Sequence, residues 1–409
     1  MKKVLITGGS GFIGNAIIKQ LHNNYEIVVL DNFSPQIHGD NYEDSYLYQS
    51  IKDLCTIIKG DVRNRDDVAK ALQGVDYIIH LAAETGTGQS MYEINRYTDV
   101  NIMGTSNLFD VMLKEKMTVK KFILASSRSV YGEGMYDCKT HGVVVPKSRD
   151  IDAMKKGNFE VTCPLCASEV TLRYTTEECP LTPISYYAYT KLAQEKMLEV
   201  LCPTINLPYT IFRYQNVYGA GQSLDNPYTG ILSIFSKMLL KNQALNIFED
   251  GLESRDFIHV SDVAAITCNA LENEATNYQY VNVGTGEKVS VMQVAETLKR
   301  LYGSTSDIKI SGDFRKGDIR HNIADMSRGR DLCGFVPAFT FEQGMEEFAA
   351  WVKQQDQDNK LEKEDGRFER SLEEMKANRH ADSRRGLRRP SEGWKHAKQT
   401  CVIYWHPHL

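Results

Sequence analysis

The feature that most constrains this chain is a glycine-rich turn near its N-terminus, directly after the apolar run 4–6. Gly8 permits a tight turn after a buried strand, and Gly11 lets the backbone come close to a pyrophosphate group. Gly14 lets the following helix pack closely on the sheet, with its free N–H groups and positive dipole end directed at the phosphates. The spacing therefore predicts a strand, a turn and a helix that together bind a dinucleotide.

The residues after the turn support this interpretation. Ile17, Ile18 and Leu21 have helical spacing, and the apolar run 27–30 predicts a second buried strand that ends at Asp31. A carboxylate at this place accepts hydrogen bonds from a ribose 2′-OH and repels a 2′-phosphate, which favours NAD over NADP. A solvated Asp at a strand end is the alternative, and the upstream glycines make it the less favoured one.

Length and composition narrow the class of protein. With 409 residues and 42% hydrophobic content, the chain can bury one large core or two moderate ones. A net charge of -5 does not suggest nucleic-acid binding. No apolar run approaches the roughly 20 residues that span a bilayer, and the N-terminus lacks a signal-peptide pattern. We therefore expect a cytoplasmic enzyme without nucleic-acid or membrane partners.

Short apolar runs alternate with helical patterns through the first part of the chain. The runs 56–58, 77–79 and 122–124 each precede small or polar residues, and a helical pattern lies between the last two. This alternation predicts an α/β fold with a doubly wound parallel sheet of the Rossmann type. Ligands of such sheets gather at the carboxyl ends of the strands.

Several residues after these runs are candidates for cofactor contacts. Asp61 is placed to reach an adenine, and Ala82 and Ala83 are placed to line the cofactor channel. Asn101 has two interpretations, because a buried Asn can also satisfy neighbouring backbone groups.

Three residues predict proton transfer coupled to hydride transfer. Tyr187 and Lys191 are four residues apart, which places them on one face of a helix. A phenol with a pKa near 10 is a poor base, but a nearby ammonium group, helped by the nicotinamide charge, favours the phenolate. Ser127, at a strand end, can hydrogen-bond the reacting oxygen. A tyrosine and lysine at this spacing are often ordinary surface residues, but the N-terminal turn and Ser127 favour the catalytic interpretation.

Taken together, these motifs resemble the extended short-chain dehydrogenase/reductase family, and within it the nucleotide-sugar epimerases and dehydratases. The resemblance covers about residues 1–350, with the motifs in the family order. It implies NAD as cofactor and a smaller C-terminal α/β domain that binds a nucleotide sugar. The residues implied for cofactor binding are Gly8, Gly11, Phe12, Ile13, Gly14, Asp31, Asn32, Asp61, Val62, Leu81, Ala82, Ala83, Asn101, Tyr187, Lys191 and Tyr214.

The same resemblance implies substrate contacts further along the chain. Asn216 lies in a segment whose Asn contacts the nucleotide sugar in the family. Arg255, Arg315 and Asp318 are similar to the groups that hold the diphosphate and the nucleotide ribose. Guanidinium groups suit this work because they offer several charge-assisted donors to phosphate oxygens. Each arginine taken alone is also consistent with a surface ion pair.

The residues after Ser127 bear on the reaction. Sugar dehydratases of this family carry an Asp-Glu pair where this chain has Arg128 and Ser129, so we expect no dehydration. The Cys base of the related epimerase-reductases is also missing. We therefore expect an isomerase that oxidises sugar C4 reversibly and returns the hydride to the other face. The alternatives are a 4-keto-sugar reductase and a non-catalytic NAD sensor, and the retained catalytic residues disfavour the sensor.

The segment 82–92, together with an insertion described next, resembles the epimerases that interconvert dTDP-L-rhamnose and dTDP-6-deoxy-L-talose. This resemblance places Glu84, Thr85 and Gln89 against the sugar, with loop ordering as the alternative role. A UDP-hexose 4-epimerase is the competing assignment.

The insertion, residues 133–183, carries a metal-binding pattern. Cys138 and His141 form one pair, and Cys163 and Cys166 form a second, each with two residues between its members. Three thiolates and one imidazole suit tetrahedral zinc and leave no open position for catalysis, so we predict a structural zinc ribbon. Cys179 is a substitute ligand if His141 is not used, and three reduced cysteines with a solvated histidine are the alternative.

The predicted domain organisation follows from these motifs. Residues 1–132 and 184–214 form the NAD-binding domain, 133–183 the insertion, and 215–352 mainly the substrate domain. The polar, charged residues 353–409 are expected to form a tail, partly helical or disordered. The family resemblance also implies a homodimer built from the long helices around Asn101 and Tyr187.

Overall fold

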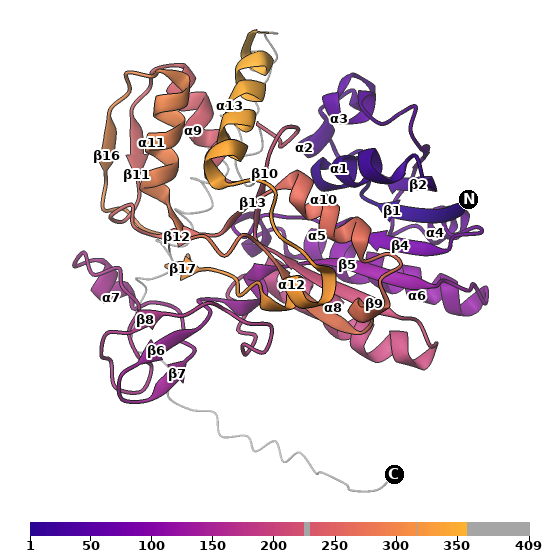
Figure 1. The fold of residues 1–409 in the computed structure, drawn as a ribbon, viewed down its shortest axis with the longest axis horizontal. Helices are drawn as coiled ribbons and strands as arrows, with labels where there is room; N and C mark the ends of the chain where they lie inside the picture. Colours follow the sequence, from indigo (N-terminus) through magenta and orange to yellow (C-terminus); the bar gives the residue numbers. More distant parts are fainter. Residues whose placement is uncertain (225–229, 316, 358–409) are drawn as a thin grey trace, which may run out of the picture.

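The computed structural model describes residues 1–224, 230–315 and 317–357. Its centre is a seven-stranded sheet with the order β14-β9-β5-β4-β1-β2-β3, in which all neighbouring strands are parallel (Figure 1). The predicted doubly wound parallel sheet is therefore confirmed. Its strands are β1 (Lys2–Thr7), β2 (Tyr25–Asp31), β3 (Thr56–Lys59), β4 (Tyr77–His80), β5 (Lys121–Ser127), β9 (Tyr209–Tyr214) and β14 (Gln279–Val283).

Helices cover both faces of this sheet because alternate residues of its strands are apolar on each side. Val4 and Ile6 pack into one core, and Leu5 packs into the other. The first face is covered by α1 (Phe12–Leu21), α10 (Val260–Asn269) and α12 (Ser327–Cys333). The second is covered by α4 (Arg65–Ala71), α6 (Gly104–Lys114) and α8 (Tyr186–Thr204).

Short elements connect these layers. They are α2 (Pro35–His38), α3 (Tyr46–Gln49), α5 (Ile94–Tyr97), the π-helical turn Thr98–Met103, and the 3-10 turns Tyr42–Asp44, Gln89–Met91, Arg128–Tyr131 and Glu274–Thr276.

A smaller α/β part with its own core lies beside the sheet (Figure 1) and is called the substrate part, after the role predicted for it. Three helices and several short strands form it, and α11 begins with a capping box between Ser290 and Gln293. The strand β14 and the helices α10 and α12 also fall within residues 215–352 but belong to the central sheet. The elements of the smaller part are α9 (Ile231–Leu240), α11 (Val291–Tyr302), α13 (Phe341–Gln357), β10 (Asn216–Tyr218), β11 (Leu245–Ile247), β12 (Ser254–Arg255), β13 (Phe257–His259), β15 (Val289–Ser290), β16 (Ile308–Ile310) and β17 (His321–Asn322).

The insertion forms a separate small unit below the substrate part in Figure 1. Its three strands make an antiparallel sheet with the order β7-β6-β8. A small core that includes Tyr136, Val144 and Val161 also contains Cys138 and Cys163. Its elements are β6 (Tyr136–Cys138), β7 (Gly142–Val144), α7 (Ile151–Met154) and β8 (Thr171–Leu172).

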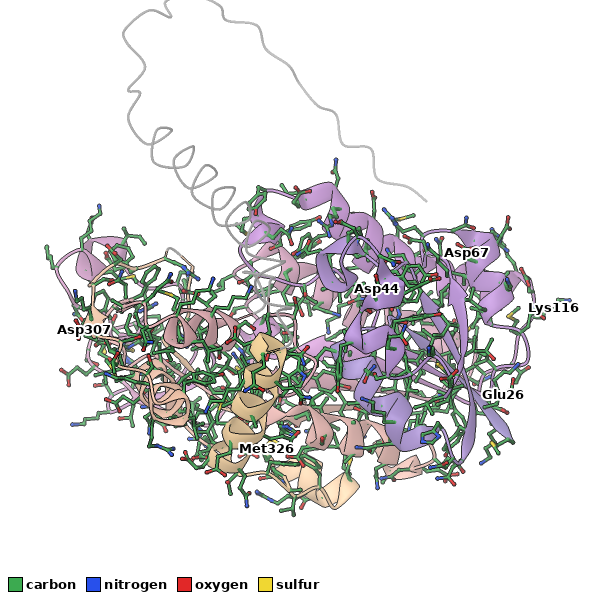
Figure 2. The ribbon with its side chains drawn as sticks, turned by 90° about the horizontal axis from the view of Figure 1, so that it is seen from above. Glu26, Asp44, Asp67, Lys116, Asp307 and Met326 are labelled. Carbon is green, nitrogen blue, oxygen red and sulfur yellow. The ribbon has the colours of Figure 1, made fainter. Side chains whose placement is uncertain are left out.

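The molecule is elongated, and Figure 2 places Asp307 of the substrate part and Lys116 of the sheet part at opposite ends. Helix α13 continues to Gln357, five residues into the predicted tail, and the rest of that tail lies outside the described residues. Within the described residues, the helices are too short or too polar to cross a membrane.

Candidate active site

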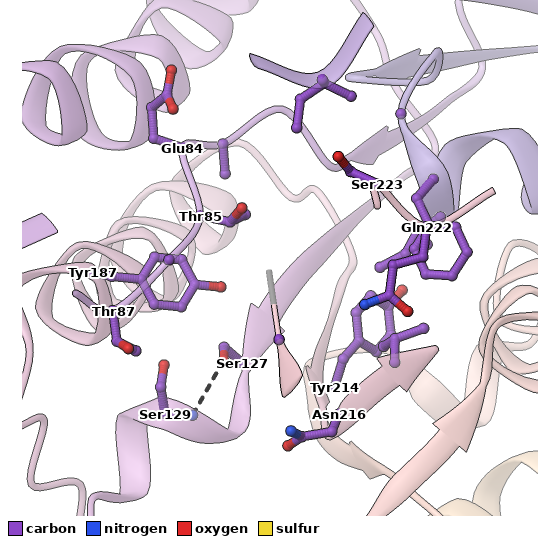
Figure 3. A pocket seen from close by; sticks show the side chains of 18 of the residues that line it. Glu84, Thr85, Thr87, Ser127, Ser129, Tyr187, Tyr214, Asn216, Gln222 and Ser223 are labelled. Atoms are coloured by element: carbon purple, nitrogen blue, oxygen red, sulfur yellow. Dashed lines mark hydrogen bonds between the residues drawn. The ribbon is translucent and has the colours of Figure 1, made fainter. Parts of the chain in front are cut away.

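A cavity of about 800 Å³ lies at the carboxyl ends of the central strands, between the sheet and the substrate part. This volume is within the range of small-molecule sites. Most residues predicted from the sequence to bind cofactor or substrate line this one cavity (Figure 3). They are Gly8, Gly11, Phe12, Ile13, Gly14, Asp31, Asn32, Val62, Leu81, Ala82, Ala83, Glu84, Thr85, Ser127, Tyr187, Lys191, Tyr214, Asn216, Arg255, Arg315 and Asp318.

The glycine-rich turn forms a cradle that side chains would fill. Gly8 has a φ of +67°, and a Cβ on it would lie 2.7 Å from the backbone nitrogen of Ala82. A Cβ on Gly14 would lie 2.5 Å from Cα of Gly9. Helix α1 starts after Gly11, which has no side chain to cap the free N–H groups. These N–H groups face the cavity end of the sheet, so the turn fits the diphosphate of a dinucleotide.

Asp31 is buried where β2 ends. Its carboxylate accepts hydrogen bonds from the backbone N–H of Ser10 at 3.0 Å and of Phe33 at 2.9 Å. Burial raises the pKa of Asp31 to about 6, against the effect of these hydrogen bonds. A carboxylate offers about four acceptor sites, so it can still accept hydroxyl groups of a ribose.

Three predicted site residues do not line the cavity. Asp61 is bound instead by Arg63, at 2.9 Å and 2.7 Å, and by Asn32. Asn101 is fully buried and holds the backbone of Glu84 through both N–H and C=O. This is the backbone-satisfying role that the sequence left open for Asn101.

Gln89 is the third of these residues. Its side chain exchanges hydrogen bonds with Gln36 and accepts one from the hydroxyl of Tyr97. It therefore orders the loop 84–89 and does not reach the cavity lining. Glu84, by contrast, lines the cavity and forms an ion pair of 2.8 Å with Arg96.

The predicted catalytic residues meet at the floor of the cavity. Helix α8 begins after Ser185, whose side chain accepts a hydrogen bond from the N–H of Ala188. Tyr187 and Lys191 therefore lie one turn apart at the start of this helix, beside Ser127 at the end of β5. Figure 3 shows the Tyr187 hydroxyl pointing into the cavity, with Ser127 close by. The ammonium of Lys191 donates to the carbonyl of Ala125 at 2.8 Å.

The charges around Tyr187 differ in one respect from the prediction. Burial raises the pKa of Tyr187, while a hydrogen bond with Ser127 and the charge of Arg128 act in the opposite direction. Burial lowers the pKa of Lys191 to about 7, opposed by the charge of Glu195. The prediction assigned the protein's contribution to phenolate formation to Lys191, whereas the positive charge that acts on Tyr187 in the structure is that of Arg128.

A buried ion pair that the sequence did not indicate holds α8 in place. Arg213 of β9 donates to both carboxylate oxygens of Glu195, at 3.0 Å and 2.8 Å, and both side chains are buried. Glu195 also accepts a hydrogen bond from Ser126, next to the predicted catalytic serine. The pair therefore fixes the helix that carries Tyr187 against the strands that end at the cavity.

The far end of the cavity is lined by charged residues of the substrate part. Arg255 donates to the carbonyls of Ser254, Ile319 and Arg320, so it also holds the loop before β17. Arg315 lies over the ring of Phe248, 4.9 Å from its centroid.

Arg128, which also lines the cavity, donates from Nε to Oδ1 of Asn216 at 2.8 Å. Sequence reasoning noted Arg128 only as the replacement for an acid. No local pattern marked it as a site residue.

The cysteines and histidine of the insertion form one cluster, whose four ligand atoms all lie within 4.8 Å of one another. The Cys138 and Cys166 sulfurs are 3.8 Å apart, and Nδ1 of His141 is 3.6 Å from Cys138 and 3.5 Å from Cys163. A tetrahedral zinc ion with Zn–S bonds of about 2.3 Å requires S···S distances of about 3.8 Å and S···N distances of about 3.5 Å. The cluster therefore has the size of a zinc site.

Cys179 lies outside this cluster. It is buried in a separate apolar group with Val130 and Tyr131. His141 completes the cluster of four, so Cys179 is not needed as a substitute for it.

Comparison with known proteins agrees with this geometry. The NAD dependent epimerase/dehydratase family matches residues 4–149 and 162–284, and the break between them falls within the insertion. The dTDP-L-rhamnose 4-epimerase of Burkholderia thailandensis is 35% identical over 87% of this chain and 96% of its own length. A putative UDP-glucose 4-epimerase of Methanocaldococcus jannaschii is 29% identical over 86% of this chain and 98% of its own.

Solved structures show the same relationship. The UDP-glucuronic acid 4-epimerase of Bacillus cereus, in complex with UDP-glucuronic acid and NAD, is 26% identical, with a TM-score of 0.70. The alignment covers 86% of this chain and 99% of that one. The extent of the family match and the identity to a full-length relative leave one conclusion: the chain belongs to the NAD dependent epimerase/dehydratase family.

Proposed function

We propose that the protein is an NAD-dependent nucleotide-sugar 4-epimerase, an isomerase that oxidises sugar C4 transiently and reduces it again on the opposite face. One observation carries this proposal: a single cavity joins the glycine cradle of α1 to Ser127, Tyr187 and Lys191. A non-catalytic sensor of NAD would need the cradle but not the three catalytic residues. The two 4-epimerases of Burkholderia thailandensis and Bacillus cereus support the same reaction class.

The residues of the cavity divide the work of this reaction. NAD, held by the glycine cradle of α1 and by Asp31, would supply the reversible hydride chemistry at sugar C4. Tyr187 removes the proton from the C4 hydroxyl and later gives it back, and Ser127 hydrogen-bonds the same oxygen. Burial raises the pKa of Tyr187, and the charge of Arg128 acts in the opposite direction. Lys191, one helical turn away, is proposed to add positive charge when NAD and substrate are bound.

For the substrate, we propose dTDP-L-rhamnose and its C4 epimer dTDP-6-deoxy-L-talose. The dTDP-L-rhamnose 4-epimerase of Burkholderia thailandensis is 35% identical, compared with 29% for the putative UDP-glucose 4-epimerase. UDP-hexoses remain the second candidate, because the solved relatives bind UDP-sugars. A reductase that releases a product from a 4-keto sugar would share the same cofactor residues and would differ in consuming NADH.

The test is incubation of the purified protein with NAD and dTDP-L-rhamnose, with UDP-glucose and UDP-glucuronic acid in parallel. We expect proton NMR to show a new C4 epimer of the dTDP-sugar, without a net change in NADH absorbance. Y187F should lower the rate by about 10²- to 10⁴-fold, the usual contribution of a general acid-base residue. Y278F removes a hydroxyl from an exposed tyrosine and serves as the control. Net NADH consumption with a 4-keto sugar, and no epimer, would favour the reductase.

We also propose that the insertion binds one structural zinc ion through Cys138, His141, Cys163 and Cys166. The interatomic distances above support it, as does the burial of Cys138 and Cys163 in the core of the insertion. All four ligands come from the protein, so the ion orders the chain and takes no part in the reaction. The insertion connects the strand of Ser127 to the helix of Tyr187, so the ion would also stabilise one wall of the site.

Metal analysis tests this proposal. We expect about one zinc per chain, and C163S should lose the metal and lower the unfolding temperature. C55S is the matched control, because Cys55 is half-buried and lies outside the cluster. The zinc proposal would be contradicted if the purified protein contained no metal and C163S were as stable as wild type.

A homodimer through α6 and α8 stays a proposal as well. Large apolar side chains on and beside these helices are exposed, which suits burial against a second copy. They are Ile94, Met103, Leu113, Tyr189 and Val200. Light scattering of wild type and of L113E/V200E tests it, with a monomeric mutant as the expected result.

The domain boundaries and the cytoplasmic location also stay predictions.

A further inference from the structure

Arg128 has donors that no protein group uses. A guanidinium carries five N–H groups, and in the described residues only the Nε–H of Arg128 has a hydrogen-bond partner, Oδ1 of Asn216. The remaining four belong to the terminal nitrogens of a side chain that lines the cavity. These donors are therefore available to a ligand.

The same hydrogen bond sets the orientation of Asn216. Only the amide oxygen of Asn216 can accept from Arg128, so its NH₂ group must point the other way. Asn216 also lines the cavity. Together the two side chains present six free N–H groups, four from Arg128 and two from Asn216. Their one acceptor, the amide oxygen of Asn216, already binds Arg128. A subsite made of donors suits an oxyanion better than a sugar hydroxyl, which both donates and accepts.

Gln215 provides a second, independent observation at this place. Its side chain is 5% exposed and lines the cavity, and neither its amide nitrogen nor its oxygen has a hydrogen-bond partner. A buried amide without partners costs free energy unless a ligand pairs with it. The neighbourhood of Arg128 is therefore built for a polar ligand.

Arg255, the arginine expected to hold the diphosphate, is less available. Three of its N–H groups are taken by the carbonyls of Ser254, Ile319 and Arg320. Burial, and next the charge of Arg255, lower the pKa of Arg128 to about 9, so Arg128 is a cation at neutral pH. Two half-buried guanidinium groups that line one cavity favour an anion between them.

We propose that Arg128 binds the sugar-linked phosphate of the nucleotide sugar and determines specificity for a diphosphate. The inference rests on the proposed function, because an epimerase must hold the diphosphate in place while the 4-keto sugar turns over. Arg128 directly follows Ser127, and both line the cavity, so a phosphate bound by Arg128 would lie near the residue proposed to hold the reacting oxygen. This position explains why the chain carries a cation where a dehydratase carries an acid.

Isothermal titration with nucleotides tests the proposal. The ligands are dTDP and dTMP, with UDP and UMP in parallel because the base is open, and NAD as a check on folding. We expect R128Q to weaken dTDP binding about 10- to 100-fold and dTMP binding less than about 3-fold, since only dTDP has the second phosphate. R128K keeps the charge but loses the planar fork, so it should fall between wild type and R128Q.

The matched control is R65Q, which removes an exposed arginine paired with Asp110 outside the cavity. Equal losses for dTDP and dTMP, or no loss, would overturn the role of Arg128. So would a reduced kcat with a shifted pH profile and unchanged dTDP affinity, since Arg128 would then act on Tyr187 alone. If R128Q fails to bind NAD and is misfolded, R128K carries the same comparison. Wild-type protein that binds none of the four nucleotides would instead contradict the proposed function, and this inference with it.

Discussion

The two ends of the cavity are built in different ways. The cofactor end uses backbone from adjacent strand ends, with the close approaches at Gly8 and Gly14 and the buried carboxylate of Asp31. The sugar end uses charged side chains from segments far apart in the sequence, such as Arg128 and Arg255. A backbone site depends on local conformation, whereas a side-chain site depends on how distant segments pack.

The insertion shows how far this dependence extends. Arg149 of the insertion is 3% exposed and binds both carboxylate oxygens of Glu249 at 2.7 Å, as well as the carbonyl of Asp318 at 2.9 Å. Arg320 is fully buried and donates to Glu249 and Asp250. Since Glu249 and Asp318 line the cavity, the insertion supports the wall of the sugar end through a buried ion network.

Replacing Arg149 should have the largest effect of the changes considered in this comparison. R149M leaves the buried carboxylate of Glu249 with one partner fewer, and we expect a loss of about 3–5 kcal/mol in the free energy of unfolding. Nucleotide-sugar affinity should fall while NAD affinity is retained, because the network touches only the sugar end. Urea unfolding and titration with dTDP and NAD measure these effects.

R173M is the control for this variant. Arg173 also lies in the insertion but forms an exposed ion pair with Asp137, for which about 0–1 kcal/mol is expected. Equal stability losses in the two variants would show that the buried network does not support the site.

The next largest effect is expected at the cofactor end. In G14A, the new methyl group meets backbone atoms of Gly9 at 2.5 Å, which cannot move aside like a flexible side chain. We expect NAD affinity to fall about 100-fold or more, and stability to fall by about 1–3 kcal/mol. G74A is the control, because Gly74 has a φ of +68° but open space around it. It should cost about 1–2 kcal/mol and leave NAD binding intact.

The difference between a backbone site and a side-chain site also explains which parts of the molecule could be predicted from the sequence. The parallel sheet and the family were predicted and confirmed, because glycine spacing and short apolar runs are local signals. The structure also brings Ser127, Tyr187 and Lys191 to one cavity, since parallel strands end at a common edge. It was the order of motifs, not any one residue, that made these predictions possible.

The parts that sequence reasoning missed depend on contacts between distant residues. The sequence showed Arg128 only as a replacement for the acid of dehydratases, whereas the structure places this cation in the cavity lining. The ion pair of Glu195 with Arg213 and the network of Arg149 have no spacing that marks them. Conversely, Asp61 was predicted to reach the adenine, and in the structure it pairs with Arg63 and is not part of the cavity lining.

The pH dependence of NAD binding should sharpen the assignment of Asp31. Burial raises the pKa of Asp31 to about 6, so its carboxylate is protonated below this pH and loses acceptors for a ribose. We expect the NAD dissociation constant to rise by up to about tenfold per pH unit below 6 and to stay level above 7. D31N should bind more weakly at pH 7 and show a flat profile in titrations from pH 5 to 8.

The stability of the protein without NAD should respond to Asp31 in the opposite direction. A carboxyl whose pKa is raised by folding binds more protons in the folded state between about pH 4 and 6. Its contribution to stability is therefore present at low pH and lost as the pH rises through 6. The difference between wild type and D31N in urea unfolding isolates this contribution, and a difference with the reverse slope would contradict the burial of the carboxylate.

The smallest effect is expected from replacing Gln89. Comparing Q89A with T85A distinguishes a side chain that orders the loop from one that faces the sugar. Gln89 is buried against Gln36 and Tyr97, outside the cavity lining, whereas Thr85 lines the cavity. Q89A should lower stability by about 1 kcal/mol, the usual value of a lost hydrogen bond, and change KM less than about 3-fold. T85A, with a side chain of similar polarity, should raise KM more than it lowers stability. A larger KM effect for Q89A than for T85A would show that Gln89 contacts the sugar, and that the loop adopts another conformation when substrate binds.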